Sequence, residues 1–149
     1  MSMQIISRIA LAFCLALSAG AASAAHLTQD PLTQLPLPAA TDKFQWGNQP
    51  NEMPSATICK SQYQGNLYSL SDAKLDTLVG WFESNLKGFK HTRSADGSTH
   101  VFSDARRSII VILMGKAGGD ASSVAYEKYQ PGLSEKALAG ITTHTLDCT

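Results

Sequence analysis

The cysteines constrain the fold of this chain more than any other feature. The sequence contains three, Cys14, Cys59 and Cys148. Cys14 lies in an N-terminal segment that we expect to be removed, which leaves an even pair in a chain bound for an oxidising compartment. A Cys59–Cys148 bond would join the first folded element to the last and close a loop of about 90 residues, worth roughly 4 to 5 kcal/mol in the chain-entropy model. The alternatives are a reactive thiol or a metal ligand, although neither cysteine has a CxxC partner or a histidine at ligand spacing.

The first 24 residues have the three-part layout of a secretory signal peptide. Arg8 supplies the positive charge, residues 9–17 are apolar, and Ala22-Ser23-Ala24 is a small-x-small cleavage site. A retained membrane anchor is the alternative, but it would need about 20 apolar residues and this run is shorter. We therefore predict that residues 1–24 are cleaved, that the mature chain is periplasmic or extracellular, and that it has no stable membrane insertion.

Charge limits the partners that the mature protein can have. The sequence has 12 Lys plus Arg and 12 Asp plus Glu, and loss of Arg8 with the signal leaves 11 against 12, a formal charge of −1. A balance this close to zero argues against nucleic acid and against anionic membranes as partners. The partner that we expect is an unidentified protein or small molecule, with no nucleic acid.

Residues 25–54 form a proline-rich leader ahead of a single domain at residues 55–149. The leader carries five of the six prolines, which exclude a regular helix or a central strand. We interpret it as an extended or partly disordered leader, either a tether or an arm lying on the domain, and a passive linker is the simplest interpretation. Phe44 and Trp46 are the exception, because two neighbouring aromatic residues in such a segment are expected to dock on this domain or on a partner.

The clearest element of the domain is an amphipathic helix. Ser69 and Asp72 form a capping-box pattern before it. Apolar residues then recur at helical spacing, at Leu75, Leu78, Val79, Phe82 and Leu86. This pattern predicts a helix of four to five turns that Gly88 ends in a left-handed conformation. Trp81 lies off the apolar stripe, at the edge of the buried face.

The remaining patterns predict strands and a second, short helix. We expect strands over residues 56–63, 67–70, 89–94, 98–104, 108–115, 123–129 and 141–148, with turns at Gly65-Asn66 and Asp96-Gly97. The strand at 108–115 is apolar on both faces and therefore interior. Ser134 should begin a short helix over 135–139. The predicted fold is α+β, with one long amphipathic helix packed on a four- to five-stranded, mainly antiparallel sheet, plus a short second helix.

The predicted hairpin places several polar side chains on one face. Pairing across Asp96-Gly97 puts Arg93 opposite His100 and His91 opposite Phe102. Two imidazoles and a guanidinium beside aromatic rings could bind an anionic or aromatic ligand, or hold a transition metal through the two histidines. The simpler interpretation is that these residues keep a hairpin tip soluble, because the histidines are diagonal and no third ligand follows them at recognisable spacing.

Three other groups of residues are weaker candidates for a functional site. The glycines at 115–119 lack the order of a phosphate-binding loop, and a plain loop is the better interpretation. Asp72 and Asp76 are typical of solvated residues at a helix start. The aromatic residues Trp81, Tyr126 and Tyr129 could contribute to one binding surface or could be core residues with a wet edge.

These observations lead to a functional hypothesis. We expect an exported, disulfide-bonded module that binds a ligand or a partner, with no cofactor and no resident metal, and not an enzyme. Its candidate ligand-binding residues are Trp81, His91, Arg93 and His100, and no catalytic residue is identified. The alternative is a small exported hydrolase or metalloenzyme that uses His91 and His100.

Overall fold

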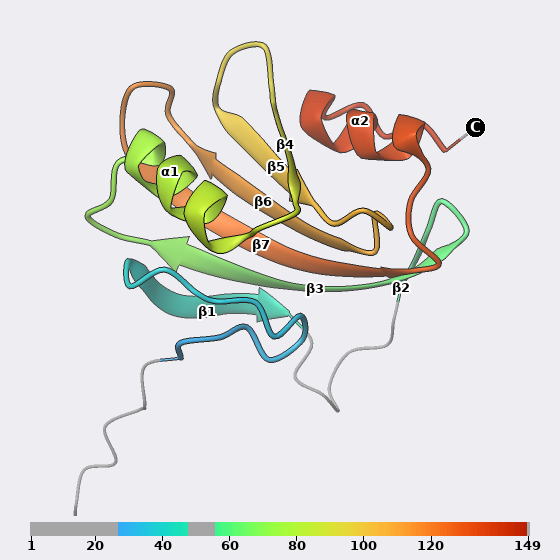
Figure 1. Cartoon of the computed structure of the whole chain (residues 1–149), viewed down its shortest axis with the longest axis horizontal. Coiled ribbons are helices and arrows are strands. Elements are labelled where there is room, and N and C mark those ends of the chain that lie inside the picture. The colour runs from blue at the N-terminus through green and yellow to red at the C-terminus, as the bar shows by residue number, and fades with distance from the viewer. Residues whose placement is uncertain (1–26, 48–55, 149) are drawn as a thin grey trace, which may run out of the picture.

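A computed structural model describes residues 27–47 and 56–148, so the predicted signal peptide at residues 1–24 lies outside the described residues. Seven strands form one antiparallel sheet, and two helices lie well apart from each other along it (Figure 1). The elements are β1 (Thr41–Gly47), β2 (Ala56–Ile58), β3 (Ser61–Leu70), α1 (Leu75–Asn85), β4 (Lys90–Arg93), β5 (Thr99–Ser103), β6 (Ile109–Gly115), β7 (Ala121–Gln130) and α2 (Glu135–Thr143). The strand order is β1-β3-β7-β6-β5-β4, and β2 pairs with β3 as well.

Each helix packs on its own core. The core under α1 includes Leu75, Phe82, Phe102, Val111 and Tyr126. The core under α2 includes Val101, Ile110, Tyr129, Leu133 and Ala137. Because successive strand residues point to opposite faces, the alternation of these residues along β5 and β6 places the two cores on opposite sides of the sheet. The predicted interior strand therefore has a helix on each face. Its residues toward α1, Val111 and Leu113, are buried, whereas on the α2 face Ile110 is buried and Ile112 is half-buried.

The α+β class is confirmed, but the predicted sizes of its parts are only partly right. The sheet has seven strands instead of four to five, because β1 and β2 both add to the free edge of β3. The first helix has 11 residues, about three turns instead of four to five.

The predicted capping box at the start of α1 is wrong. Lys74 is the N-cap residue and makes no side-chain cap hydrogen bond. The backbone around it pairs with the start of β7 instead, through Leu75 N to Gly119 O at 3.0 Å and Ala121 N to Ala73 O at 2.9 Å. These distant contacts fix where the helix begins. At the other end, Gly88 has the predicted left-handed conformation, with φ of 81°.

The predicted turn at Gly65-Asn66 is also wrong. Both residues lie inside β3, opposite Glu127 and Tyr126 of β7. The chain turns earlier, at Cys59 and Lys60, whose φ angles of 49° and 65° are both left-handed. A two-residue turn with this geometry matches the twist of the flanking strands, which makes β2 and β3 a tight hairpin.

The C-terminal strand predicted for residues 141–148 does not form. Ser134 caps α2 as expected, since its hydroxyl accepts a hydrogen bond from Ala137 N at 3.1 Å. The helix then continues to Thr143 and ends at His144 in the left-handed conformation, with φ of 58°. Gly140 lets the chain fold back closely, because a Cβ there would lie 2.6 Å from the carbonyl oxygen of Thr145.

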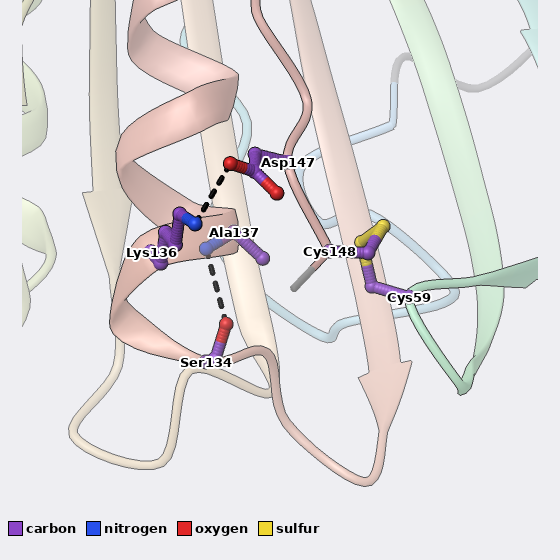
Figure 2. The surroundings of a disulfide bond; sticks show 6 residues. All are labelled: Cys59, Ser134, Lys136, Ala137, Asp147 and Cys148. Atoms are coloured by element: carbon purple, nitrogen blue, oxygen red, sulfur yellow. Dashed lines mark hydrogen bonds and ion pairs between the residues drawn. A yellow bond between two sulfur atoms is a disulfide. The ribbon is translucent and has the colours of Figure 1, made fainter.

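The predicted disulfide is confirmed. Cys59 and Cys148 are bonded, with Cα atoms 4.9 Å apart and a separation of 89 positions in sequence. Figure 2 shows the segment after α2 reaching the β2–β3 turn, with an ion pair from Lys136 Nζ to Asp147 Oδ2 at 2.8 Å beside it. An intramolecular disulfide fits an extracellular or periplasmic location. In the described part of the chain, we find no helix with the length and apolar character to span a membrane.

The described part of the leader is packed on the domain and is not a passive linker. Residues 41–47 form the edge strand β1. Before it, Leu37 is buried in the core under α1, and Tyr126 OH donates a hydrogen bond to Pro36 O at 2.8 Å. The backbones of Phe44 and Trp46 lie opposite Tyr68 and Leu67. The predicted docking of their side chains lies outside what the structure describes.

Candidate functional site

The β4–β5 hairpin has the predicted register. His91 lies opposite Phe102, and Arg93 lies opposite His100. The Asp96-Gly97 turn holds this register, with Gly97 at a φ of 71°. Hydrogen bonds from Ser94 and Ser98 to the Asp96 carboxylate lower its pKa to about 2, so the turn keeps an ionised acceptor at all ordinary pH values.

Helix α1 passes over this hairpin and leaves a pocket of about 490 Å³ between them. The strand side of the pocket carries His91, Thr92, Arg93 and His100, and the helix side carries Asp76, Val79, Gly80 and Glu83. Gly80 keeps the pocket open, because a Cβ at this position would have no atom within 4 Å. We call this hollow the α1–hairpin pocket.

Three of the four predicted ligand-binding residues therefore lie together, and the fourth does not. His91, Arg93 and His100 line the pocket, whereas Trp81 is absent from its walls. Trp81 is half-buried at the edge of the core, as expected, with its ring edge-to-face on Phe82 at 4.9 Å between centroids.

A chain of short polar contacts runs along the pocket floor. Glu83 Oε1 lies 2.9 Å from His91 Nδ1, and His91 Nε2 lies 2.9 Å from His100 Nδ1. His100 Nε2 lies 3.2 Å from the carbonyl oxygen of Gly97. The His91 ring also stacks on Phe102, with centroids 4.4 Å apart and planes inclined by 11°. Packing and hydrogen bonding together hold both imidazoles in fixed orientations.

Counting protons shows what this chain of contacts requires. Its two ends, the Glu83 carboxylate and the Gly97 carbonyl, are both acceptors, so its three contacts need three N–H donors. Two neutral imidazoles supply only two, because each carries one N–H. All three hydrogen bonds form together only when the histidine pair holds one additional proton. The Glu83 carboxylate lies at the His91 end of this pair.

We expect the ring of His100 to titrate below its ordinary pKa of 6.5. Burial is the main cause, followed by the charge of His91 and, more weakly, that of Arg93, while the Gly97 carbonyl and Asp76 oppose them. The unfolded chain then binds more protons, so stability from this group is complete above about pH 6.5 and is lost as the pH falls toward the folded-state pKa. Ring NMR shifts followed against pH measure this value directly.

The variant His91→Gln separates the two causes of the shift. It removes the neighbouring charge and keeps His100 buried, so the His100 pKa should rise but stay below its ordinary value. A His100 pKa at or above the ordinary value in the wild-type protein would contradict the contact geometry described here.

The other candidate site residues from the sequence do not lie together in one site. Tyr126 and Tyr129 belong to the two different cores, so they do not share one binding surface. The glycines at 115–119 lie at the end of β6 and in the loop before β7. Within residues 27–47 and 56–148, no three His, Cys, Asp or Glu side chains are grouped to hold a metal ion.

Two carboxylates that sequence reasoning missed are prominent in the structure. Asp30, a residue of the leader, is fully buried. Glu127 is half-buried on β7, where the hydroxyls of Tyr63 and Tyr129 donate to it. Alternation along β7 did not indicate that Glu127 is buried, because a charged residue in a strand is typical of a solvent-facing position.

Comparison with known proteins identifies no relative. A scan against protein-family models finds no match, and searches of curated proteins and of solved structures find none either.

Proposed function

We propose that this protein is an exported, disulfide-bonded binding module that holds a small zwitterionic ligand in the α1–hairpin pocket. The observation that carries the proposal is the distribution of charge around this one hollow. Arg93 and the imidazoles lie on the strand side, and Asp76 and Glu83 lie on the helix side. A ligand with an anionic group toward the strands and a cationic group toward the helix would satisfy both sets. Export rests on the signal-like residues 1–24 and on the disulfide.

The pocket has the size and rigidity that such a site needs. Its volume of about 490 Å³ falls within the usual range for small-molecule sites. His91 and His100 are already held by hydrogen bonds and by stacking, so a ligand would not have to order them. Because less conformational freedom is lost on binding, more of the interaction energy contributes to affinity.

Backbone amide NMR with L-alanine as the probe tests this proposal, with acetate and ethylammonium as its two half-ligands. We expect L-alanine to shift the amides of Gly80, His91 and His100 and to bind more tightly than either half-ligand. Arg93→Gln should weaken binding by about 10-fold, the effect of losing one charge-assisted hydrogen bond.

Gly80→Leu is the blocking variant and Asn85→Leu is its matched control. A leucine at 80 would fill the open pocket and would improve helix propensity by about 0.5–1 kcal/mol, so the protein should stay folded. Asn85 is exposed on the same helix and does not line the pocket. Binding should be lost in the first variant and kept in the second. The proposal is wrong if millimolar L-alanine leaves these amides unshifted, or if Gly80→Leu binds it unchanged.

A further inference from the structure

A second polar cluster lies on the opposite face of the sheet, around Glu127. Tyr129 OH donates to Glu127 Oε2 at 2.6 Å, and Tyr63 OH donates to Glu127 Oε1 at 3.3 Å. The two tyrosine rings lie side by side, with centroids 5.2 Å apart. One carboxylate is therefore held between two aromatic side chains, one from β3 and one from its own strand β7.

Gly65 makes this arrangement possible. It lies directly opposite Glu127 in the β3–β7 pairing. A Cβ at position 65 would lie 2.3 Å from the hydroxyl oxygen of Tyr63, well inside contact distance. The missing side chain leaves the space through which Tyr63 leans toward the carboxylate. This accounts for a glycine in the middle of a long strand, where it would otherwise weaken pairing.

A pocket of about 250 Å³ opens in front of this carboxylate. Its walls are mostly apolar and include Leu67, Ile112, Met114 and Ile141, with His144 also lining it. Ile141 is in the last turn of α2, so the pocket lies beside the end of that helix. The hollow therefore combines mostly apolar walls with one carboxylate, Glu127, and one aromatic ring, that of Tyr63. Apolar walls with a few placed polar groups are typical of small-molecule sites.

The charge of Glu127 has no counter-ion in the described part of the chain, where the ion pairs involve other residues. Burial raises the pKa of the Glu127 carboxyl, and the hydrogen bonds from Tyr129 and Tyr63 oppose that effect only in part. An ionised carboxylate in low-dielectric surroundings is stabilised most by a cation that comes into contact with it.

We propose that this second pocket binds an alkylammonium group, with the Glu127 carboxylate as its counter-ion. The ammonium donates to the carboxylate oxygens and lies near the ring of Tyr63, whose face favours a cation. The alkyl chain then occupies the apolar walls. This site is separate from the α1–hairpin pocket, which lies on the other face of the sheet, and does not depend on it.

Titration with n-butylammonium, followed by backbone amide NMR, tests the proposal, with n-butanol as a neutral probe of the same length. We expect n-butylammonium to shift the amides of Gly65, Ile112 and Glu127 and to bind more tightly than n-butanol. Glu127→Gln keeps the shape of the side chain and removes its charge, so it should weaken n-butylammonium by at least about 10-fold and leave n-butanol unchanged. Glu135→Gln, the same change at an exposed position on α2, should have no effect.

The pH dependence gives a second measurement. The affinity for n-butylammonium should fall as the pH is lowered through the Glu127 pKa, because protonation removes the counter-charge, whereas n-butanol should show no such fall. Equal affinities of the two probes, or an unchanged n-butylammonium affinity in Glu127→Gln, would overturn the proposal. Shifts of the amides of Gly80 and His91 would instead indicate binding in the α1–hairpin pocket. The proposal for each pocket can therefore be contradicted without affecting the other.

Discussion

Replacing Cys59 and Cys148 together by serine is expected to lower the free energy of unfolding by about 4 to 5 kcal/mol, as the chain-entropy model gives for a closed loop of this length. The bond joins positions separated by 89 in sequence, so its loss frees nearly the whole domain in the unfolded state. It also releases the segment after α2 from the β2–β3 turn (Figure 2). A loss of this size is comparable to the whole stability of many small domains.

Urea denaturation of the double variant and of the wild-type protein measures this loss, and reduced wild-type protein is the matched control. Reduction breaks the same bond and keeps both cysteine side chains. Cys148 is exposed, so most of any difference between the two samples would report on packing at the half-buried Cys59. We expect them to agree within about 1 kcal/mol, the typical effect of a modest side-chain change. An oxidised protein no more stable than either would show that the bond does not constrain the unfolded chain.

The sequence predicted two features of this fold correctly, the register of the β4–β5 hairpin and the disulfide. The Asp96-Gly97 turn and strict alternation gave the β4–β5 register to the residue, and the even pair of cysteines gave the disulfide. The turn at Cys59 and Lys60 was missed because neither residue type favours a left-handed backbone. That turn is held by pairing of β2 with β3 and by the distant bond from Cys59 to Cys148.

For the candidate site, the sequence predicted the strand side of the pocket but not the helix side. His91, Arg93 and His100 share a face because of hairpin register, which sequence alternation contains. Gly80 and Glu83 join them only because α1 crosses this hairpin, and helical periodicity indicates which face of α1 is buried but not where it lies. The same limit applies to Asp30, whose partners on β3, Asn66 and Tyr68, are 36 and 38 positions away in sequence.

Asp30 holds the leader on the domain through a buried set of hydrogen bonds. The side chain is fully buried, and Oδ1 accepts from Asn66 Nδ2 at 2.7 Å and from Tyr68 OH at 2.6 Å. Oδ2 accepts from Thr33 N at 2.7 Å and from Thr33 Oγ1 at 2.8 Å. One carboxylate thus joins the leader turn to strand β3, on the same face as α1. An acceptor-only group suits this place, because every contact is a donor.

Asp30→Asn is therefore expected to lower the free energy of unfolding by about 3 kcal/mol, from buried donors left without an acceptor. Whichever way the new amide turns, its NH₂ group replaces one oxygen and faces two donors. Denaturation measures the loss, and amide hydrogen exchange over residues 27–40 shows whether the leader detaches first. Asp72→Asn is the matched control, because Asp72 is exposed and its φ of 53° suits asparagine, so its effect should stay within about 0.5 kcal/mol. If Asp30→Asn is as harmless as this control, then the buried carboxylate does not anchor the leader, and packing of Leu37 under α1 must do so.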